Sequence, residues 1–331
     1  MHRDRSTAEP PDGRHVAVQE ERPLKQQARE KFHGVVTATP TTFDKGGDLD
    51  EGRFRELVEG YVAAGVHGIS VAGSQGEFYV LDTAERLRLM EITVETVAGR
   101  VPVYAGTGTV STRESIALTR AAESIGVDVA MVITPYFLSP SGRELSEHFR
   151  TVAAATALPV LLYNNPPRTG VNVTPDVYAD CARSGNIIGV KDSSGDLSQA
   201  VEYLLADSGC RLFSGRDTIT MALLAHGGAG AISPAANVFP QLVCRMYDAV
   251  RADDLATARR INDALAPLRR AWGLGSFPVV IKEAMAAVGL DPGPARAPIS
   301  PLPPERRAQL NAVVEEIREF ERGAVPAISG A

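Results

Sequence analysis

The 331-residue sequence contains few cysteines and lysines and no long hydrophobic run. Its three cysteines, Cys181, Cys210 and Cys244, lie far apart without a CxxC pair. This argues against a disulfide framework or a cysteine-built zinc site, and it fits a reducing, cytoplasmic setting. No apolar stretch approaches the ~20 residues that a membrane span needs. The net charge of −6 argues against a surface that binds nucleic acid or anionic membranes.

Two further features concern metal binding and the N-terminus. The six histidines are scattered and form no HxH or HxxxH pair, so no metal site is predicted. Residues 1–31 are charged throughout, lack the apolar region of a secretory signal, and hold too few apolar side chains to offset the entropy of ordering them. This segment is therefore predicted to be a disordered tail. The whole chain is 44% hydrophobic and 22% charged, which is the composition of a globular protein with a sizeable core.

From residue 33 onward, short apolar runs alternate with longer amphipathic stretches. The runs lack clean period-2 alternation, which is typical of parallel strands buried on both faces. They cover residues 33–39, 68–73, 101–106, 128–134, 159–164, 186–191, 210–215 and 228–233. Helix start signals stand between them, such as Asp82 with Glu85, Ser111 with Glu114, and Thr174-Pro175.

Eight strand–helix units in about 220 residues predict a (β/α)8 barrel. An open doubly wound sheet is the competing arrangement, but GVVTATPTTF after the first strand is not a dinucleotide fingerprint. We assign residues 32–252 to the barrel. Residues 253–331 are assigned to a C-terminal helical appendage, because stretches near 253–271, 277–288 and 303–322 show helical patterns.

The active site of such a barrel lies at the carboxyl ends of its strands. Only five lysines occur in the chain, and one of them, Lys191, ends the apolar strand NIIGVK. Burial of an ammonium lowers its pKa, so the neutral amine becomes available as a nucleophile toward a carbonyl. The alternative is a structural lysine that pairs with a carboxylate such as Asp192 or Glu77. Position and composition alone favour neither interpretation.

Other polar groups follow neighbouring strands. Tyr163 ends the preceding strand, where its hydroxyl is placed to move protons near Lys191, or else is an amphipathic core residue. The turn GSQGE, with Gly73, Ser74 and Gln75, offers free N–H groups for a carboxylate unless it is a plain turn. Arg168 has the planar fork that suits a carboxylate, although most loop arginines are merely solvated.

Six motifs together resemble the dihydrodipicolinate synthase / N-acetylneuraminate lyase family, whose members are pyruvate-dependent class I aldolases. The resemblance runs from about residue 33 to about 320. The motifs are GSQGE at 73–77, TPYF at 134–137, LLYNNPPRTG at 161–170, IIGVKDSSGD at 187–196, LFSGRD at 212–217 and GAISPAANV at 230–238. It implies pyruvate and an aldehyde or 2-keto acid as substrates and no cofactor beyond a covalent lysine–pyruvate imine. It also implies a homotetramer built from tight dimers.

The resemblance also implies roles for individual residues. Lys191 would form the imine, Tyr163 would relay protons, and Ser74 with the turn backbone would bind the pyruvate carboxylate. Arg168 matches the arginine that receives the carboxylate of aspartate semialdehyde, and Ile232 matches a position whose carbonyl lines the pyruvate site. The remaining substrate-binding positions are Gly73, Gln75, Gly215 and Tyr136.

Two positions depart from the synthase pattern. Phe137 replaces a tyrosine that synthases commonly lend to the neighbouring subunit, and Gln75 replaces the second threonine of the turn. The first expectation is therefore 4-hydroxy-tetrahydrodipicolinate synthase-like condensation. The alternatives are a 2-keto-3-deoxy sugar-acid or 4-hydroxy-2-oxoglutarate aldolase, or a keto-acid-binding relative without turnover. A phosphate-binding barrel isomerase would leave the buried lysine unexplained.

Overall fold

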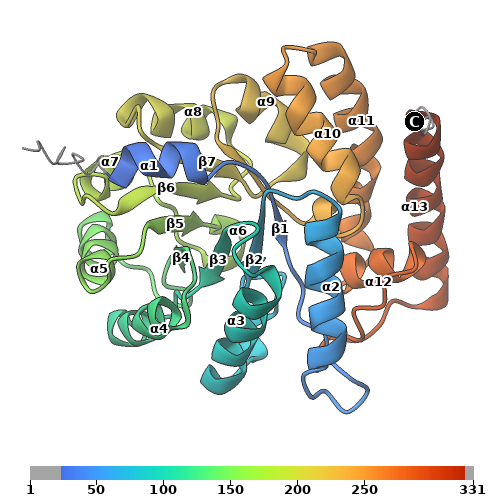
Figure 1. Ribbon diagram of the computed structural model, residues 1–331, viewed down its shortest axis with the longest axis horizontal. Helices are drawn as coiled ribbons and strands as arrows, with labels where there is room; N and C mark the ends of the chain where they lie inside the picture. Colours follow the sequence, from blue (N-terminus) through green and yellow to red (C-terminus); the bar gives the residue numbers. More distant parts are fainter. Residues whose placement is uncertain (1–23, 325–331) are drawn as a thin grey trace, which may run out of the picture.

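The computed structural model describes residues 24–324 and shows a closed barrel of eight parallel strands (Figure 1). The strands follow sequence order around the barrel, and β1 closes it by pairing with β8. They are β1 Gly34–Ala38, β2 Gly68–Val71, β3 Val103–Gly106, β4 Val129–Ile133, β5 Val160–Asn164, β6 Ile187–Asp192, β7 Arg211–Ser214 and β8 Gly230–Ser233. All eight predicted strands are confirmed, and so is the predicted barrel.

Helices surround the strands and continue beyond them. The α-helices are α1 Leu24–Lys31, α2 Glu51–Ala63, α3 Thr83–Val97, α4 Thr112–Ile125, α5 Gly142–Ala154, α6 Pro166–Thr169, α7 Pro175–Cys181, α8 Leu197–Ala206, α9 Thr220–Ala225, α10 Pro240–Arg251, α11 Leu255–Ala271, α12 Val279–Ala287 and α13 Pro304–Ala324. Short 3-10 helices are η1 Phe78–Val80, η2 Asp217–Ile219, η3 Ala235–Asn237 and η4 Trp272–Leu274. Within residues 24–324, no helix is both long and apolar enough to cross a membrane.

The predicted helix starts are present. Asp82 accepts a hydrogen bond from the Glu85 N–H, and the Glu85 carboxylate accepts one from the Asp82 N–H, which completes a capping box before α3. Ser111 accepts from the Glu114 N–H before α4. Thr174 caps α7, which begins with Pro175. These caps fix where each helix begins after its strand and therefore how its apolar face meets the barrel.

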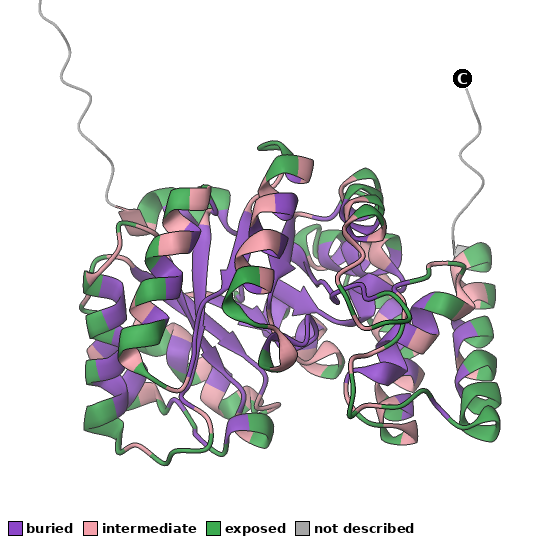
Figure 2. Cartoon of the chain, turned by 90° about the horizontal axis from the view of Figure 1, so that it is seen from below, coloured by how far each residue is buried: buried purple, intermediate pink, exposed green. Residues whose placement is uncertain are grey.

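The strands are buried on both faces, which explains their continuous apolar sequences. Inside the barrel, side chains such as Val36, Met131, Leu161 and Phe213 fill the interior. Outside it, helices cover the strands, and Figure 2 shows buried strands enclosed by helices whose outer faces are exposed. Closure is tight, because a Cβ on Gly230 would lie 2.0 Å from the carbonyl oxygen of Gly34.

One prediction about the N-terminus is wrong. Residues 24–31, which belonged to the predicted disordered tail, form α1, while the rest of that segment lies outside the described residues. The Lys25 ammonium is 2.8 Å from a carboxylate oxygen of Asp207 and donates to the carbonyl of Ala182. Ala28 is buried in the same cluster as the barrel interior. Long-range contacts to barrel residues therefore order a helix that its own composition does not favour.

The C-terminal helices pack against the barrel as well as against each other. Helix α11 lies along α10 and also contacts η2, which follows β7. Helix α13 packs on α11 and α12 and forms one side of the molecule in Figure 1. The helical character predicted for residues 253–322 is confirmed in outline. Because α11 reaches the loop after β7, this region extends to the end of the barrel where the active site is expected.

Candidate active site

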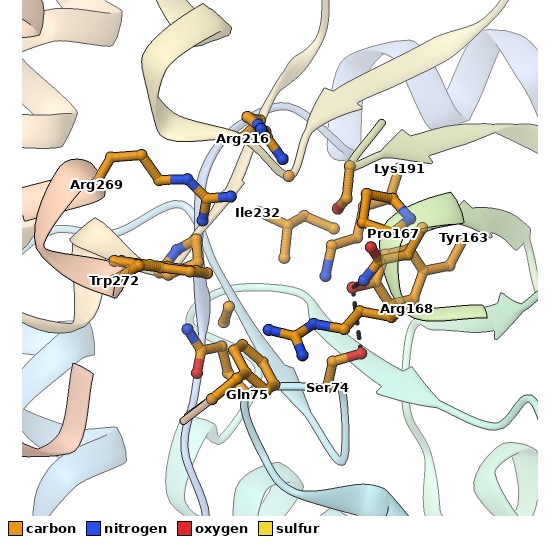
Figure 3. Close-up of a pocket in the computed structure, with 16 residues that line it drawn as sticks. Ser74, Gln75, Tyr163, Pro167, Arg168, Lys191, Arg216, Ile232, Arg269 and Trp272 are labelled. Atoms are coloured by element: carbon orange, nitrogen blue, oxygen red, sulfur yellow. Dashed lines mark hydrogen bonds between the residues drawn. The ribbon is translucent and has the colours of Figure 1, made fainter. Parts of the chain in front are cut away.

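A cavity of about 290 Å³ opens at the carboxyl ends of the strands (Figure 3). It is lined by Ala38, Ser74, Gln75, Tyr163, Asn165, Pro167, Arg168, Lys191, Ser193, Gly215, Arg216, Ile232, Pro234, Arg269, Trp272 and Phe277. Seven of the nine predicted site residues are therefore brought together. The other two, Gly73 and Tyr136, lie nearby but outside this lining.

Lys191 and Tyr163 are paired by the register of two neighbouring strands. Their Cα atoms are partners in the β5–β6 ladder, and both side chains are buried. The Lys191 Nζ lies 4.0 Å from the centroid of the Tyr163 ring. Burial lowers the pKa of Lys191, although the Tyr163 hydroxyl opposes this shift. The fold thus places an amine with weakened basicity beside a tyrosine.

The carboxylates that were candidate partners for Lys191 are engaged elsewhere. Asp192 accepts hydrogen bonds from the Asn164 amide at 2.7 Å and the Ser194 hydroxyl at 2.6 Å. Glu77 pairs with Lys282 at 2.6 Å. Among the described residues, Lys191 forms no ion pair. The interpretation of Lys191 as a structural ion-pair lysine therefore has no support in the structure.

The Tyr163 hydroxyl connects several loops of the site. It donates to the Ser74 hydroxyl at 3.2 Å and accepts from the Asn165 amide at 2.9 Å. Burial alone would raise the pKa of Tyr163, but the charge of Lys191 and hydrogen bonds with Ser74, Ser193 and Asn165 hold this pKa below its usual value. The hydroxyl is consequently poised to exchange a proton with the neighbouring amine or with a bound molecule.

The turn after β2 brings Ser74 and Gln75 to the cavity wall. It begins after Ala72 and ends at Glu77, and both of these residues have left-handed backbone angles, with φ of 51° and 55°. The Gly73 carbonyl accepts a long bond from the Phe78 N–H at 3.4 Å, so Gly73 shapes the turn without lining the cavity. The amide of Gln75 is buried and has no hydrogen-bond partner among the described residues.

A buried ion pair fixes this turn from behind. Lys282, on α12, has an Nζ that lies 2.6 Å from Glu77 and donates to the carbonyl of Pro294 at 2.7 Å. The backbone N–H of Arg296 donates to the second carboxylate oxygen of Glu77 at 3.0 Å. Glu77 and Lys282 are fully enclosed, with side-chain exposures of 0% and 2%. The C-terminal region thus holds the segment that carries Ser74.

Arg168, Gly215 and Ile232 enter from three further loops or strands. Arg168 lies on the short helix α6 after β5, and its guanidinium stacks over the ring of Phe277 at 4.4 Å. Gly215 follows β7, and Ile232 belongs to β8. Close packing surrounds Gly215, since a Cβ there would lie 2.0 Å from the Ser193 hydroxyl.

Tyr136 lies in a neighbouring cavity of about 300 Å³ that shares Ser74, Arg168 and Phe277 with the first. Its ring meets that of Phe78 edge-on at 5.7 Å. Phe137, next to it, is 96% exposed and has a φ of 71°. Tyr136 is thus adjacent to the cavity, whereas Phe137 lines neither of these two cavities.

Sequence reasoning did not single out several lining residues. Asn165 adjoins Tyr163 in sequence, and Ser193 and Arg216 follow strand ends, so position alone was a usable signal. Arg269, Trp272 and Phe277 come from the C-terminal region, where the sole tryptophan of the chain was the only hint. No group of three or more His, Cys, Asp or Glu side chains suited to a metal occurs within residues 24–324.

Comparison with known proteins agrees with this arrangement. The model of the dihydrodipicolinate synthetase family matches residues 31–317. A 4-hydroxy-tetrahydrodipicolinate synthase from Methanospirillum hungatei is 40% identical over 287 residues, which cover 86% of this chain and 98% of the relative. The solved 4-hydroxy-tetrahydrodipicolinate synthase of Methylacidiphilum fumariolicum SolV has a TM-score of 0.85 at 33% identity, covering 88% of this chain and 98% of that one.

A second solved structure contains bound pyruvate. It is a prophage protein of the dihydrodipicolinic acid synthase family from E. coli K12, in complex with pyruvate, with a TM-score of 0.84 at 33% identity over 87% of this chain and 99% of that one. Fold and site define a barrel lyase of the kind that works through a lysine Schiff base. The chain belongs to the dihydrodipicolinate synthetase family.

Proposed function

We propose that this enzyme forms an imine between Lys191 and pyruvate and uses it to join pyruvate to an aldehyde or to cleave the product of that reaction. The observation that carries the proposal is the buried Lys191, 4% exposed, which has no ion-pair partner among the described residues and whose Nζ lies 4.0 Å from the centroid of the Tyr163 ring. The pyruvate complex of the E. coli relative supports the choice of keto acid.

The proposed steps use side chains and water alone, without an added cofactor. The neutral Lys191 amine attacks C2 of pyruvate, and loss of water leaves the imine. Tyr163 accepts a proton from C3, which yields the enamine. C3 then attacks the aldehyde carbon, the aldehyde oxygen takes up a proton, and water hydrolyses the imine. Ser74 and the N–H groups of its turn hold the pyruvate carboxylate, while Gly215 and Ile232 bound the same space.

Aspartate semialdehyde is the first candidate for the aldehyde. The curated relatives at about 40% identity are named 4-hydroxy-tetrahydrodipicolinate synthase. Arg168 faces the cavity and offers a bidentate partner for the aldehyde's carboxylate. A second candidate is the cleavage of a 2-keto-3-deoxy sugar acid or of 4-hydroxy-2-oxoglutarate. It is favoured by Gln75, whose amide has no partner among the residues that the structure describes and suits a hydroxylated substrate.

Assembly into a homotetramer is part of the proposal. Tyr79, Phe137 and Leu138 are exposed apolar side chains, and Tyr79 borders the cavity that contains Tyr136. An apolar surface of this kind is typical of protein–protein contacts. Sedimentation of the purified protein measures the state directly, and a monomer at micromolar concentration would contradict it.

Borohydride reduction in the presence of pyruvate tests the imine. Peptide mass spectrometry should find one reduced pyruvyl group, at Lys191. Lys282 serves as an internal control, because it is also buried but its ammonium is held by Glu77. Lys191→Arg should abolish the adduct, since a guanidinium does not deprotonate in proteins. Modification elsewhere, or none, would contradict the mechanism, and an adduct without turnover of any aldehyde would indicate a binding protein.

A further inference from the structure

The cavity that contains Lys191 is lined by three arginines, and no aspartate or glutamate of the described residues lines it. Arg168, Arg216 and Arg269 come from three different parts of the chain: α6, the loop after β7, and α11. In the described part of the chain, none of them forms an ion pair. Because unpaired guanidinium groups around one cavity repel each other, the arrangement calls for an anionic ligand.

The three guanidinium groups share one space. Figure 3 shows Arg168 and Arg269 extending into the cavity from different sides, with Arg216 above them. Arg269 stacks on Trp272, with its guanidinium carbon 3.8 Å from the ring centroid. Burial lowers the pKa of Arg269, and the charges of Arg216 and Arg168 lower it further, whereas Asp217 opposes the shift. The Asp217 carboxylate accepts from the Ser233 hydroxyl at 2.6 Å and does not line the cavity.

Buried polar atoms on the same wall lack partners. Among residues 24–324, neither the amide nitrogen nor the amide oxygen of Gln75 has a hydrogen-bond partner, and the residue is 4% exposed. The buried indole N–H of Trp272 likewise has no partner within that range. A buried donor or acceptor without a partner is costly. These atoms therefore indicate a ligand rich in oxygen.

The three arginines of the cavity carry more positive charge than the carboxylates of pyruvate and the aldehyde require. The turn at Ser74 receives the pyruvate carboxylate, and Arg168 receives one carboxylate of the aldehyde, which leaves Arg216 and Arg269. We propose that Arg216 and Arg269 form a second anion-binding subsite, so that a carboxylate or phosphate beyond the carboxylate bound by Arg168 strengthens the binding of an aldehyde. This inference rests on the proposed imine chemistry and extends its substrate class to dianionic aldehydes.

Two aldehydes that differ only at the carbon next to the carboxylate bound by Arg168 provide the test. Succinic semialdehyde carries a hydrogen there, and (2-oxoethyl)malonate carries a second carboxylate. With saturating pyruvate, kcat/KM for the dicarboxylate should exceed that for succinic semialdehyde by ~10-fold or more, the contribution of one charge-assisted hydrogen bond. Glyceraldehyde 3-phosphate, compared with glyceraldehyde, shows whether phosphate is the preferred anion.

Substitutions of the two arginines test whether they cause the preference for a dianionic aldehyde. Arg216→Gln and Arg269→Gln should each remove most of it by raising KM for the dianionic aldehyde, and Arg269→Lys should restore part of it. Arg270→Gln is the matched control, because Arg270 is the next residue of α11, is exposed, and does not line the cavity. Every variant should still form the reduced pyruvyl adduct at Lys191.

The outcomes separate the two proposals. If wild-type enzyme forms no adduct with pyruvate, the imine chemistry fails. If the adduct forms but neither a second carboxylate nor a phosphate improves kcat/KM, the subsite is wrong. The same holds if Arg216→Gln and Arg269→Gln keep the preference for the dianion.

Discussion

Replacement of Lys282 by methionine should destabilise the protein and disturb the active site together. The change keeps the length of the side chain but leaves the Glu77 carboxylate, with 0% exposure, without its cation. Removal of one partner of a buried ion pair costs about 3–5 kcal/mol. For an ordered chain of roughly 300 residues, with an unfolding entropy of about 0.6 kcal/mol/K, this corresponds to a Tm lower by ~5–8 °C.

The assay combines thermal unfolding with pyruvate trapping at 25 °C. Because Glu77 ends the turn that carries Ser74, Lys282→Met should also raise the pyruvate KM of the folded enzyme. The double variant E77Q/K282M should recover part of the stability, since it removes the unpaired charge. Lys45→Met, at an exposed lysine, is the control. A Tm within 1 °C of wild type for Lys282→Met, or a double variant no more stable than the single one, would refute the reasoning.

Three other predictions concern the chemistry. Tyr163→Phe should lower kcat by about 10²–10⁴-fold, the contribution of a positioned acid–base group, while the fold survives; a loss below about threefold in steady-state assays would make Tyr163 a packing residue. Arg168→Ala should raise the KM of the carboxylate-bearing aldehyde ~10-fold or more without affecting pyruvate trapping, and Arg168→Lys should rescue only partly; an unchanged KM would reassign Arg168. Because burial lowers the pKa of Lys191, the rate of adduct formation should rise with pH and reach half its maximum below pH 10.5; a midpoint at or above that value in a stopped-flow pH series would contradict the buried-amine argument.

The sequence supported the barrel and the centre of its site because the relevant signals are local. Two-sided burial leaves continuous apolar runs, and the end of each run marks the edge where functional groups gather. Lys191 was recognisable because a lysine at the end of such a strand is rare. The register between β5 and β6 then placed Tyr163 beside it.

The features that the sequence did not predict depend on contacts between segments that are distant along the chain. In the sequence, Glu77 was a plausible ion-pair partner for Lys191. Only the packing of α12 shows that Glu77 pairs with Lys282 instead. Arg269, Trp272 and Phe277 reach the cavity because α11 leans on the loop after β7, which no local pattern encodes. Helix α1 was missed for the same reason, since the anchor of Lys25 is Asp207.

The two walls of the cavity come from different parts of the chain, which can vary independently among relatives. The reacting amine and its tyrosine stand on barrel strands whose side chains also fill the core, so few substitutions there preserve the fold. The opposite wall, Arg269, Trp272 and Phe277, occupies a single stretch of nine residues that ends α11 and precedes α12. Exchange of that stretch between relatives would transfer the contribution of Arg269 and its neighbours to the choice of aldehyde, while the pyruvate half of the reaction stays with the barrel.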